Sequence, residues 1–308
     1  MLQSLQIRLE NLKKLKNRFN KEHITCFRAY DQDLPEYAVA VDIYEKWVHV
    51  QEYRAPDTVD PKKAESRLTD VLSVLPDILE IPSENIFLKE RRRQKGNAQY
   101  MKLGSDEIFH EVDESGCRFL IKFTGYLDTG LFLDNRITRS MIRDMARGKQ
   151  FLNLFAYTGT ATVYAAKGGA RSTTSVDTSN VYIDWAKRNL ALNGFSYNRH
   201  FFHHADCLRW LKNERQTYDL IFLDPPTFSN SKKSNRLFDL QKDHVGLIQL
   251  VARRLTKDGI ILFSNNYRKF KMDLAGLKEF QIEDLSRTTL PPDFERRPKA
   301  HNCWKITR

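Results

Sequence analysis

The sequence predicts an α/β protein in which a small α+β domain precedes a doubly wound parallel sheet. The first observation is that short apolar runs alternate with helical patterns from Gln150 onward. The second is that the run YDLIFLD at 218–224 has a continuous apolar centre, as a strand covered on both faces does. The third is that the earlier residues show hairpin patterns instead, so we expect domains over 1–125 and 126–308.

The second half of the chain is expected to repeat the order strand, helix. Apolar runs predict strands at 151–155, 172–177, 200–205, 218–224 and 259–265, with an edge strand at 301–307. Helical patterns predict helices at 161–167, 180–192 and 239–255, and a short helix through Trp210. Gly-Gly and Asn-Gly pairs follow the first two helices, and such residues commonly end a helix.

The first half carries shorter elements. Leucines and Phe19 at three- and four-residue spacing predict one amphipathic helix over 1–22. That helix either packs on its own domain or presents its basic residues to a membrane surface or an RNA. Alternation predicts hairpins over 37–53 and 107–123 and a strand at 85–92, and a helix is expected over 61–75, ended by Pro76.

The composition is that of a soluble globular protein and excludes several classes. Of 308 residues, 41% are hydrophobic and 29% are charged, which suits two domains with sizeable cores. No run of ~20 apolar residues is present, so no membrane span is expected. The N-terminal residues carry charge throughout, so no secretory signal is expected.

The four cysteines are spread widely, at Cys26, Cys117, Cys207 and Cys303. This spacing contains no CxxC pair, no zinc knuckle and no dense disulfide framework. We therefore expect free thiols, a reducing cytoplasmic compartment and no metal site.

The net charge of +11 favours a polyanionic partner, nucleic acid first. Basic residues gather at 89–96, at 231–236 and at 296–299. Each cluster is either a solvated face or a phosphate-binding surface, and RNA contact is favoured most for the second, which follows a strand end. The candidate RNA-binding residues are Arg91, Arg92, Arg93, Lys95, Lys232, Lys233 and Arg236.

Ligands of open α/β sheets bind outside the carboxyl ends of the strands, so the residues that follow each strand are informative. The loop at 156–160 contains a single glycine, Gly159, where a tight turn must expose backbone N–H groups. Neither GxGxxG nor GxxxxGK[ST] is present, which disfavours NAD and ATP. The loop therefore favours a nucleoside cofactor without phosphates.

Acidic residues end two further strands. Asp177 is positioned to accept hydrogen bonds from two ribose hydroxyls, although it, Thr178 or Ser179 can equally cap a helix. Asp206 suits an adenine amino group, with a helix cap again as the alternative.

The segment Asp224-Pro225-Pro226-Thr227-Phe228 is the most specific signal. Two prolines after a buried strand leave backbone carbonyls without ladder partners, and Asp224 adds a carboxylate that accepts hydrogen bonds from a planar nitrogen base. Phe228 offers a stacking face. The alternative, an ordinary proline-terminated strand, does not explain why acid, diproline and aromatic occur together.

Four segments of the second half resemble the class I S-adenosylmethionine-dependent RNA methyltransferases. They are NLFAYTGTATVYAAKGGA, then VD, AD and LDPPTFSNSKK. Five further segments extend the resemblance to the C-terminal, guanine-N7 half of the bacterial bifunctional 23S rRNA methyltransferases. They are LPEYAVAVDIYEKWVHVQEY, KERRRQKGNAQYMKLG, YLDTGLFLDNR, FSNNYRKFKMDL and HNCW. The N-terminal half of those enzymes, which carries a THUMP module and methylates guanine N2, has no counterpart in this chain.

The resemblance implies a Rossmann-like class I methyltransferase fold with seven mostly parallel strands, the last antiparallel. It implies S-adenosylmethionine as cofactor, S-adenosylhomocysteine as product and 23S rRNA or its precursor as substrate. A THUMP-containing guanine-N2 half, fused or separate, is an implied partner. The residues expected at the cofactor are Phe132, Asp134, Arg136, Asn153, Phe155, Tyr157, Thr158, Gly159, Asp177, Thr178, Ser179, Asp206, Cys207 and Asp224.

Guanine N7 carries a lone pair and no proton, so its methylation needs alignment and no general base. We expect Asp224, Pro225, Pro226 and Phe228 to frame the base, with Asp224 stabilising its developing positive charge. Methylation of cytosine C5 is the first alternative, but it requires a cysteine nucleophile, and the segments after 224 and 264 hold none. A non-catalytic RNA-binding module and an NAD-dependent oxidoreductase are the remaining alternatives.

Overall fold

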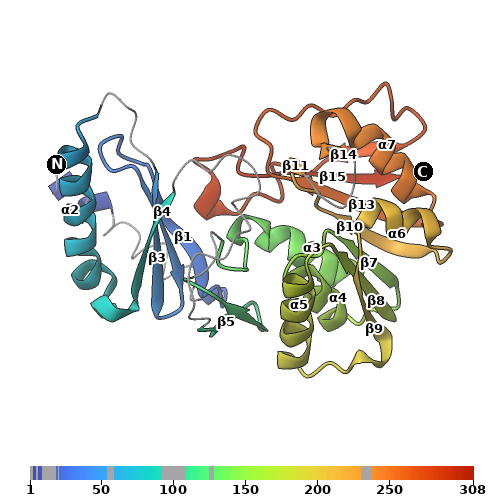
Figure 1. The fold of residues 1–308 in the computed structure, drawn as a ribbon, viewed down its shortest axis with the longest axis horizontal. Coiled ribbons are helices and arrows are strands. Elements are labelled where there is room, and N and C mark those ends of the chain that lie inside the picture. The colour runs from blue at the N-terminus through green and yellow to red at the C-terminus, as the bar shows by residue number, and fades with distance from the viewer. Residues whose placement is uncertain are drawn as a thin grey trace. The chain divides into compact units, whose positions relative to one another are not determined.

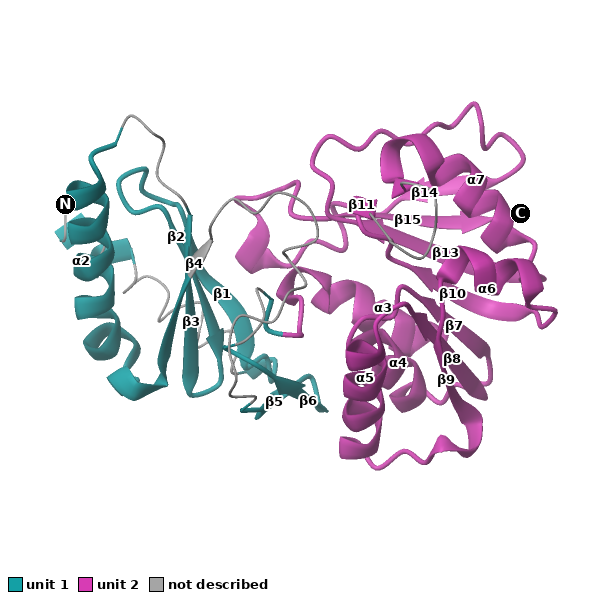
Figure 2. Cartoon of the chain, viewed as in Figure 1, with its two compact units in different colours: residues 1–129 teal, residues 130–308 magenta. Residues whose placement is uncertain are grey.

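The computed structural model describes residues 3–4, 6–8, 19, 21–53, 59–91, 108–124, 128–229 and 238–308, except for the side chains of residues 90 and 91. The chain forms two compact units, Met1–Thr129 and Gly130–Arg308 (Figure 2). The division falls a few residues after the boundary expected between 125 and 126. Among the described residues, no helix is both long enough and apolar enough to cross a bilayer.

Unit 1 is built on a four-stranded sheet in the order β1-β2-β3-β4 (Figure 1). The first three strands are antiparallel neighbours, and β3 and β4 are parallel. The strands are β1 Cys26–Asp31, β2 Val39–Tyr44, β3 Trp47–Tyr53 and β4 Ile86–Arg91. The hairpin expected over 37–53 and the strand expected at 85–92 are confirmed, whereas β1 has no counterpart among the predicted elements.

Helix α2, Pro61–Leu79, packs on one face of this sheet. Its apolar side, with Val71 and Leu75, shares a core with Val48 and Val50 of β3. Asp60 caps the helix by accepting a hydrogen bond from the backbone N–H of Lys62 at 3.0 Å.

The expectation that Pro76 ends this helix is wrong. A proline removes its own backbone N–H and crowds the carbonyl one turn earlier, but its own carbonyl still accepts a hydrogen bond from Glu80. The helix ends instead at Glu80, which adopts the left-handed conformation with φ of 57°.

The second expected hairpin is also present, as β5 His110–Glu114 and β6 Cys117–Ile121. Its turn residues Ser115 and Gly116 have φ values of 54° and 76°, the left-handed pair typical of a two-residue hairpin turn. Of the helix predicted over 1–22, residues 3–4, 6–8, 19 and 21 are helical and residue 22 lies in a turn, and the other residues lie outside the described part of the chain.

Unit 2 is a seven-stranded sheet in the order β14-β15-β13-β10-β7-β8-β9 (Figure 1). Its strands are β7 Gln150–Leu154, β8 Ser172–Asp177, β9 His200–His204, β10 Tyr218–Leu223, β13 Leu255–Asn265, β14 Gln281–Asp284 and β15 Asn302–Thr307. Strands β13, β10, β7, β8 and β9 are parallel, and β15 is antiparallel to both of its neighbours. The expected class I sheet is thus confirmed.

The helices of unit 2 are α3 Arg136–Met145, α4 Thr160–Lys167, α5 Asn180–Leu192, α6 Cys207–Asn213 and α7 Leu240–Ala252. The last four coincide with predicted helices. Helix α3 and strand β14 were not predicted, because α3 is strongly charged and β14 is short and mostly exposed. A short pair, β11 Phe228–Ser229 and β12 Phe238–Asp239, leads into α7.

One apolar core lies between the sheet of unit 2 and helices α6 and α7, with Leu223, Ile248 and Phe263 among its members. A second core lies on the opposite face and includes Ile142 of α3 and Ala165 of α4. Both faces of the central strands are therefore covered, which accounts for their continuous apolar sequences.

Candidate functional site

The loop after β7 is held in a strained backbone conformation. Phe155, Tyr157 and Gly159 have φ values of 57°, 49° and 72°, all in the left-handed region. Non-glycine residues rarely adopt it, and such strain concentrates at ligand sites. The loop thereby aims the backbone N–H of Tyr157 at the end of β8, where it donates a hydrogen bond to Oδ2 of Asp177 at 2.9 Å.

Asp177 accepts a second hydrogen bond from the backbone N–H of Ser179, which reaches Oδ1 at 2.9 Å. Burial raises the pKa of Asp177, while the backbone donors Ser179 and Tyr157 oppose that rise. The backbone N–H of Thr178 is a third donor to this carboxylate. A carboxylate offers about four acceptor positions, so capacity for a ribose hydroxyl remains. The cap of α5 is Ser179, whose Oγ accepts from the N–H of Tyr182 at 3.3 Å; Asp177 is not that cap.

Three aromatic side chains line up beside this acid. The ring centroid of Tyr157 lies 5.2 Å from that of Phe132 and 4.6 Å from that of Tyr182. Phe132 is 36% exposed, so part of this surface is open to a ligand. An aromatic wall next to a hydroxyl-binding carboxylate is typical of nucleoside sites.

Gly159 is required at its position for two reasons. Its φ of +72° favours glycine, and a Cβ built on it meets the Cβ of Ala186 at 2.6 Å. The start of α4 therefore packs directly against α5. Gly130 is packed as tightly, because its Cβ would lie 2.4 Å from the indole of Trp185.

Asp206 adopts the alternative that the sequence left open, a helix cap. Its Oδ1 accepts a hydrogen bond from the backbone N–H of Arg209 at 2.9 Å, at the start of α6. A contact with adenine therefore stays a prediction.

The neighbouring Cys207 is buried, and its thiol accepts a hydrogen bond from the backbone N–H of Phe155 at 3.4 Å. Burial holds the pKa of this thiol well above its ordinary value, which is typical of a packing residue, and cofactor contact stays a prediction.

Asp224 follows β10 and lies in an unusual electrostatic setting. Burial raises its pKa from 3.8 to about 6, and the charge of Asp134 adds to the rise. His301, Ser264 and Arg139 act in the opposite direction. Two carboxylates, a histidine and a buried arginine thus share one part of unit 2, which is the arrangement that perturbs pKa values at functional sites.

The surroundings of Asp224 are assembled from distant parts of unit 2. His301 Nδ1 lies 3.5 Å from Oδ2 of Asp134, and its Nε2 is 3.0 Å from Oγ1 of Thr289. Ser264, at the end of β13, donates to Oδ1 of Asn135 at 3.4 Å. The segment that begins at Phe132 therefore lies against the ends of β13 and β15.

Sequence reasoning missed His301, Ser264 and Arg139 as members of this cluster. None belongs to a local motif, and their proximity follows from strand order alone. The one available signal was that Asp134 and His301 both fall in segments that carried the family resemblance.

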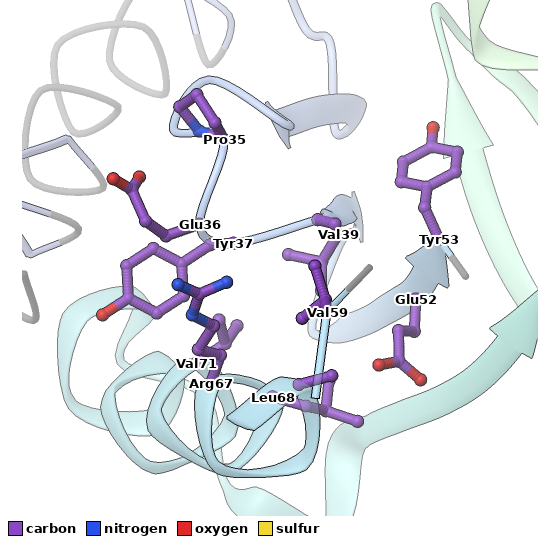
Figure 3. A pocket seen from close by; sticks show the side chains of 12 residues that line it. Pro35, Glu36, Tyr37, Val39, Glu52, Tyr53, Val59, Arg67, Leu68 and Val71 are labelled. Carbon is purple, nitrogen blue, oxygen red and sulfur yellow. The ribbon is translucent and has the colours of Figure 1, made fainter. Parts of the chain in front are cut away.

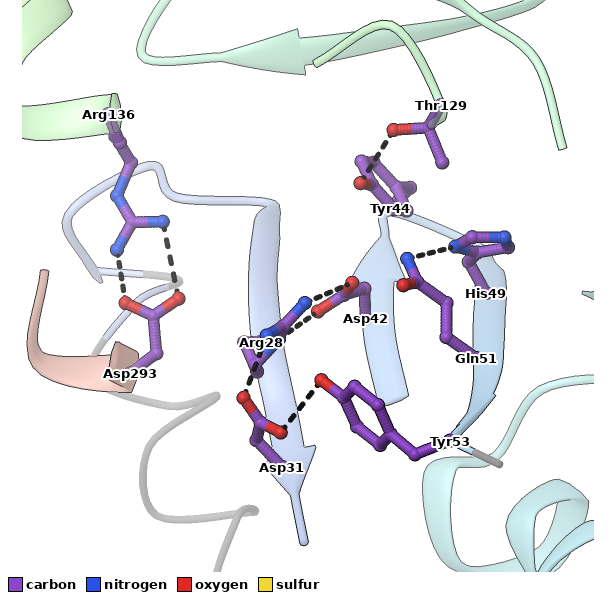
Figure 4. A network of polar contacts seen from close by, with 10 residues as sticks. All are labelled: Arg28, Asp31, Asp42, Tyr44, His49, Gln51, Tyr53, Thr129, Arg136 and Asp293. Atoms are coloured by element: carbon purple, nitrogen blue, oxygen red, sulfur yellow. Dashed lines mark hydrogen bonds and ion pairs between the residues drawn. The ribbon is translucent and has the colours of Figure 1, made fainter. Parts of the chain in front are cut away.

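Three expected cofactor residues are engaged inside the protein. The Nδ2 of Asn153 donates to Oγ1 of Thr162 at 2.9 Å, between β7 and α4. Arg136 pairs with Asp293 at 2.6 Å in a buried ion pair, drawn in Figure 4. Thr158 is buried and donates from Oγ1 to the carbonyl of Gly130 at 2.6 Å. These contacts shape the loops around the site, and direct cofactor contact stays a prediction for each residue.

The expected RNA-binding residues fall on parts of the chain that the structure does not place. Arg92, Arg93 and Lys95 lie outside the described residues, as do Lys232, Lys233 and Arg236. Arg91 ends β4, and its side chain is not described.

Unit 1 holds a separate surface pocket between the segment before β2 and helix α2 (Figure 3). Tyr37 and Arg67 lie next to each other on its wall, and Glu36 and Glu52 also line it. None of the expected cofactor residues belongs to this pocket. The strand ends of unit 2 therefore remain the candidate site.

The residues present fit a nucleoside cofactor. Asp177 supplies remaining acceptor capacity, and Tyr157 and Phe132 supply partly exposed aromatic surface. The loop lacks the glycine pattern of a pyrophosphate site, so the cofactor expected there carries no phosphates that an arginine or a lysine would have to bind.

Comparisons with known proteins agree with this geometry. A family model described as S-adenosylmethionine-dependent methyltransferase matches residues 33–291. The ribosomal RNA large subunit methyltransferase K/L of Methylococcus capsulatus is 56% identical over 303 residues, covering 96% of this chain and 41% of that protein. The protein of the same name from Allochromatium vinosum is 55% identical over 302 residues, with coverage of 96% and 41%.

Solved structures show the same fold. An S-adenosylmethionine-dependent methyltransferase from Streptococcus mutans superposes with a TM-score of 0.76 at 22% identity, covering 100% of this chain and 81% of that one. A methyltransferase complexed with S-adenosylhomocysteine gives a TM-score of 0.76 at 23% identity, with coverage of 99% and 81%. The chain spans about two-fifths of the length of the curated relatives that it matches. The chain belongs to the S-adenosylmethionine-dependent methyltransferase family.

Proposed function

We propose that this chain transfers a methyl group from S-adenosylmethionine to N7 of a guanine in 23S rRNA. The observation that carries the proposal is the partly buried carboxylate of Asp224, placed with Asp134 and His301 and followed by two prolines. The printed name of the relatives, a large-subunit ribosomal RNA methyltransferase, supports the substrate class.

Bound S-adenosylmethionine supplies a methyl group that its sulfonium already activates for displacement. The protein then has to hold two reactants in line, at a separation of ~3 Å, and to exclude water. Asp177 and the wall made by Tyr157 and Phe132 orient the cofactor side.

On the substrate side, Asp224 acts on the positive charge that develops when the lone pair of N7 forms a bond to the methyl carbon and the carbon–sulfur bond of the donor breaks. A carboxylate held in a site of low polarity stabilises such a charge more strongly than one in water. Because N7 carries no proton, no residue has to remove one. Pro225, which is buried, and Pro226 fix the backbone next to the base.

Guanine N7 lies in the deep, narrow groove of an A-form helix, so the target base must be unpaired or flipped out. Phe228 is 59% exposed just beyond the two prolines. It is the side chain best placed to stack on an extruded base.

Methylation at cytosine C5 is disfavoured by the cysteines. It needs a thiolate that adds to the ring, and all four cysteines are buried and free. Burial raises the pKa of the Cys303 thiol to about 12, and the negative charge of Asp224 adds to this rise. No thiol of this chain is therefore suited to that chemistry.

We further infer that the active protein works with a second half. The relatives are more than twice as long as this chain, and the guanine-N2 half expected from the family carries a THUMP module. That half is proposed as a fused or separate partner in the cytoplasm. The basic clusters around Arg91 and Lys232 are proposed to bind rRNA phosphates.

The test uses labelled S-adenosylmethionine, this chain and in vitro transcribed 23S rRNA, followed by nuclease digestion and mass spectrometry of the nucleosides. We expect 7-methylguanosine as the labelled product. Labelled 5-methylcytidine or N2-methylguanosine in its place would refute the assignment of N7. RNA binding without any labelled nucleoside would indicate a non-catalytic RNA-binding module.

A further inference from the structure

The loop that follows β13, residues 266–271, presents basic side chains at the carboxyl edge of the sheet. Arg268, Lys269 and Lys271 are exposed. Within the described part of the chain, none of the three forms an ion pair through its side chain. Their charges are therefore available to an external anion.

This loop is held firmly at its start. The Oδ1 of Asn265 accepts from the backbone N–H of Tyr267 and from Nδ2 of Asn302, each at 3.1 Å. The same Nδ2 donates to the carbonyl of Tyr267 at 3.1 Å. Asn265 is buried, so the turn at Tyr267 is determined by the interior of the protein.

The loop is held equally at its end. The ring of Phe270 packs 4.9 Å from His244 and 5.2 Å from Trp304, centroid to centroid. The side chain of Gln241 bonds to both the N–H and the carbonyl of Lys271, at 2.9 Å each. The exposed residues between these anchors are thus presented by a rigid support, which lowers the entropy lost on binding.

The loop also contacts the segment that follows the two prolines. The ring of Tyr267 lies 6.2 Å from that of Phe228 in an edge-on arrangement. Thr227 donates from Oγ1 to Oδ1 of Asn266 at 3.2 Å. The two aromatic rings therefore lie together, and the exposed Arg268 and Lys269 follow Tyr267 directly in the chain.

We propose that Phe228, Tyr267, Arg268 and Lys269 form a binding surface for the single-stranded RNA that flanks the methylated base. Phe228 stacks on the extruded base, Tyr267 stacks on the base next to it, and Arg268 and Lys269 bind the flanking phosphates. Aromatic rings interleaved with cations are the common means of binding single-stranded nucleic acid. This inference rests on the proposed function, because it takes the substrate to be RNA.

The first test removes the two charges with Arg268→Ala and Lys269→Ala together. We expect KM for in vitro transcribed 23S rRNA to rise about tenfold and the salt dependence of binding to flatten by up to ~1.4 log units per log salt. The affinity for S-adenosylhomocysteine, measured by calorimetry, should not change. A wild-type salt slope in this variant would overturn the proposal.

The matched control is the pair Arg253→Ala and Lys257→Ala. Both residues are exposed, and Lys257 lies near the start of β13, at the opposite edge of the sheet from Asn265. Removing the same charge there should leave KM and the salt slope unchanged. An equal loss in the control would show that only the net charge matters and would also overturn the proposal.

The second test locates the RNA by photocrosslinking from Lys269→Cys. The four native cysteines are buried, so a photoreactive thiol reagent should attach only to the new residue. Crosslinks are expected within a few nucleotides of the methylated base, and Lys257→Cys should give none there. Crosslinks confined to remote regions of 23S rRNA would contradict a flanking-strand surface.

The two proposals fail in different ways. The identity of the labelled nucleoside tests the reaction, and it does not depend on these variants. The salt slope and the crosslink position test the surface, and both can be read whichever base is methylated. If wild-type protein makes no product but the Arg268 and Lys269 variant still loses RNA affinity relative to its control, the surface stands and the reaction does not.

Discussion

The backbone N–H of Tyr157 donates to Oδ2 of Asp177 at 2.9 Å, so the turn after β7 and the acid after β8 are joined directly. The bond explains how a loop with left-handed residues stays in place. It also orients the carboxylate, since Ser179 holds the other oxygen. The two residues therefore form one preorganised unit at the proposed cofactor site.

Asp177→Asn should weaken binding of S-adenosylhomocysteine by about 10- to 100-fold, because an amide nitrogen cannot accept the hydroxyl hydrogen bonds of a ribose. Isothermal calorimetry measures the loss, and RNA affinity should stay close to that of the wild type. Asp184→Asn is the control, since Asp184 is an exposed acid on α5. Equal cofactor affinity in Asp177→Asn and wild type would remove the ribose assignment.

Gly159→Ala should destabilise the protein by about 2–4 kcal/mol, because it adds left-handed strain to a clash with Ala186. Gly194→Ala isolates the strain, since Gly194 has φ of +77° and open space around its Cβ position. It should cost about 1 kcal/mol. Urea unfolding measures both changes, and similar losses for the two variants would show that close packing of α4 on α5 is unimportant.

The pH dependence of methyl transfer should report the ionisation of Asp224. With its pKa raised to about 6, the rate should rise as the pH increases through that value and the carboxylate loses its proton. Asp224→Asn should lower kcat by about 100-fold and remove this rise. A wild-type pH profile in Asp224→Asn would exclude the electrostatic role.

The stability of Asp224→Asn should change with pH in a defined direction. An acid whose pKa is raised on folding binds more protons in the native state between its ordinary value of 3.8 and about 6. Its carboxyl therefore favours folding below this window and loses that contribution above it. Thermal melts at low and neutral pH should show Asp224→Asn gaining stability relative to the wild type as the pH rises.

Breaking the pair of Arg136 and Asp293 should be costly. The two charged atoms lie 2.6 Å apart, with side-chain exposures of 5% and 0%. Arg136→Met removes the cation that lies 2.6 Å from this buried carboxylate and should destabilise the protein by about 3–5 kcal/mol. Replacing both residues, by Met and Leu, should recover much of this loss in the same thermal unfolding assay.

The exposed pair of Lys187 and Asp184 provides the comparison for that experiment. Its side chains are 42% and 54% exposed, and Lys187→Ala should cost less than about 1 kcal/mol. A loss as small as this in Arg136→Met would mean that the buried pair contributes little to the position of the segment after Phe132.

The sequence by itself determined the alternating architecture of the second half, because strand and helix periodicities are local properties of the chain. It also located the acids and the diproline segment at strand ends, since each ends an apolar run. Pro76 shows the limit of such rules, because one missing N–H did not outweigh the packing of α2 on its sheet. The sequence also leaves the role of Asp206 open, because a helix cap and a ligand contact can use the same residue type.

Tertiary structure alone decided which distant residues meet. His301 reaches Asp134 because β15 returns beside β13, and Tyr267 reaches Phe228 because the loops after β10 and β13 end at one edge. The raised pKa of Asp224 depends on the same assembly, since burial and a neighbouring charge exist only in the folded chain. Electrostatic and packing interactions act through space, and a one-dimensional pattern does not record those distances.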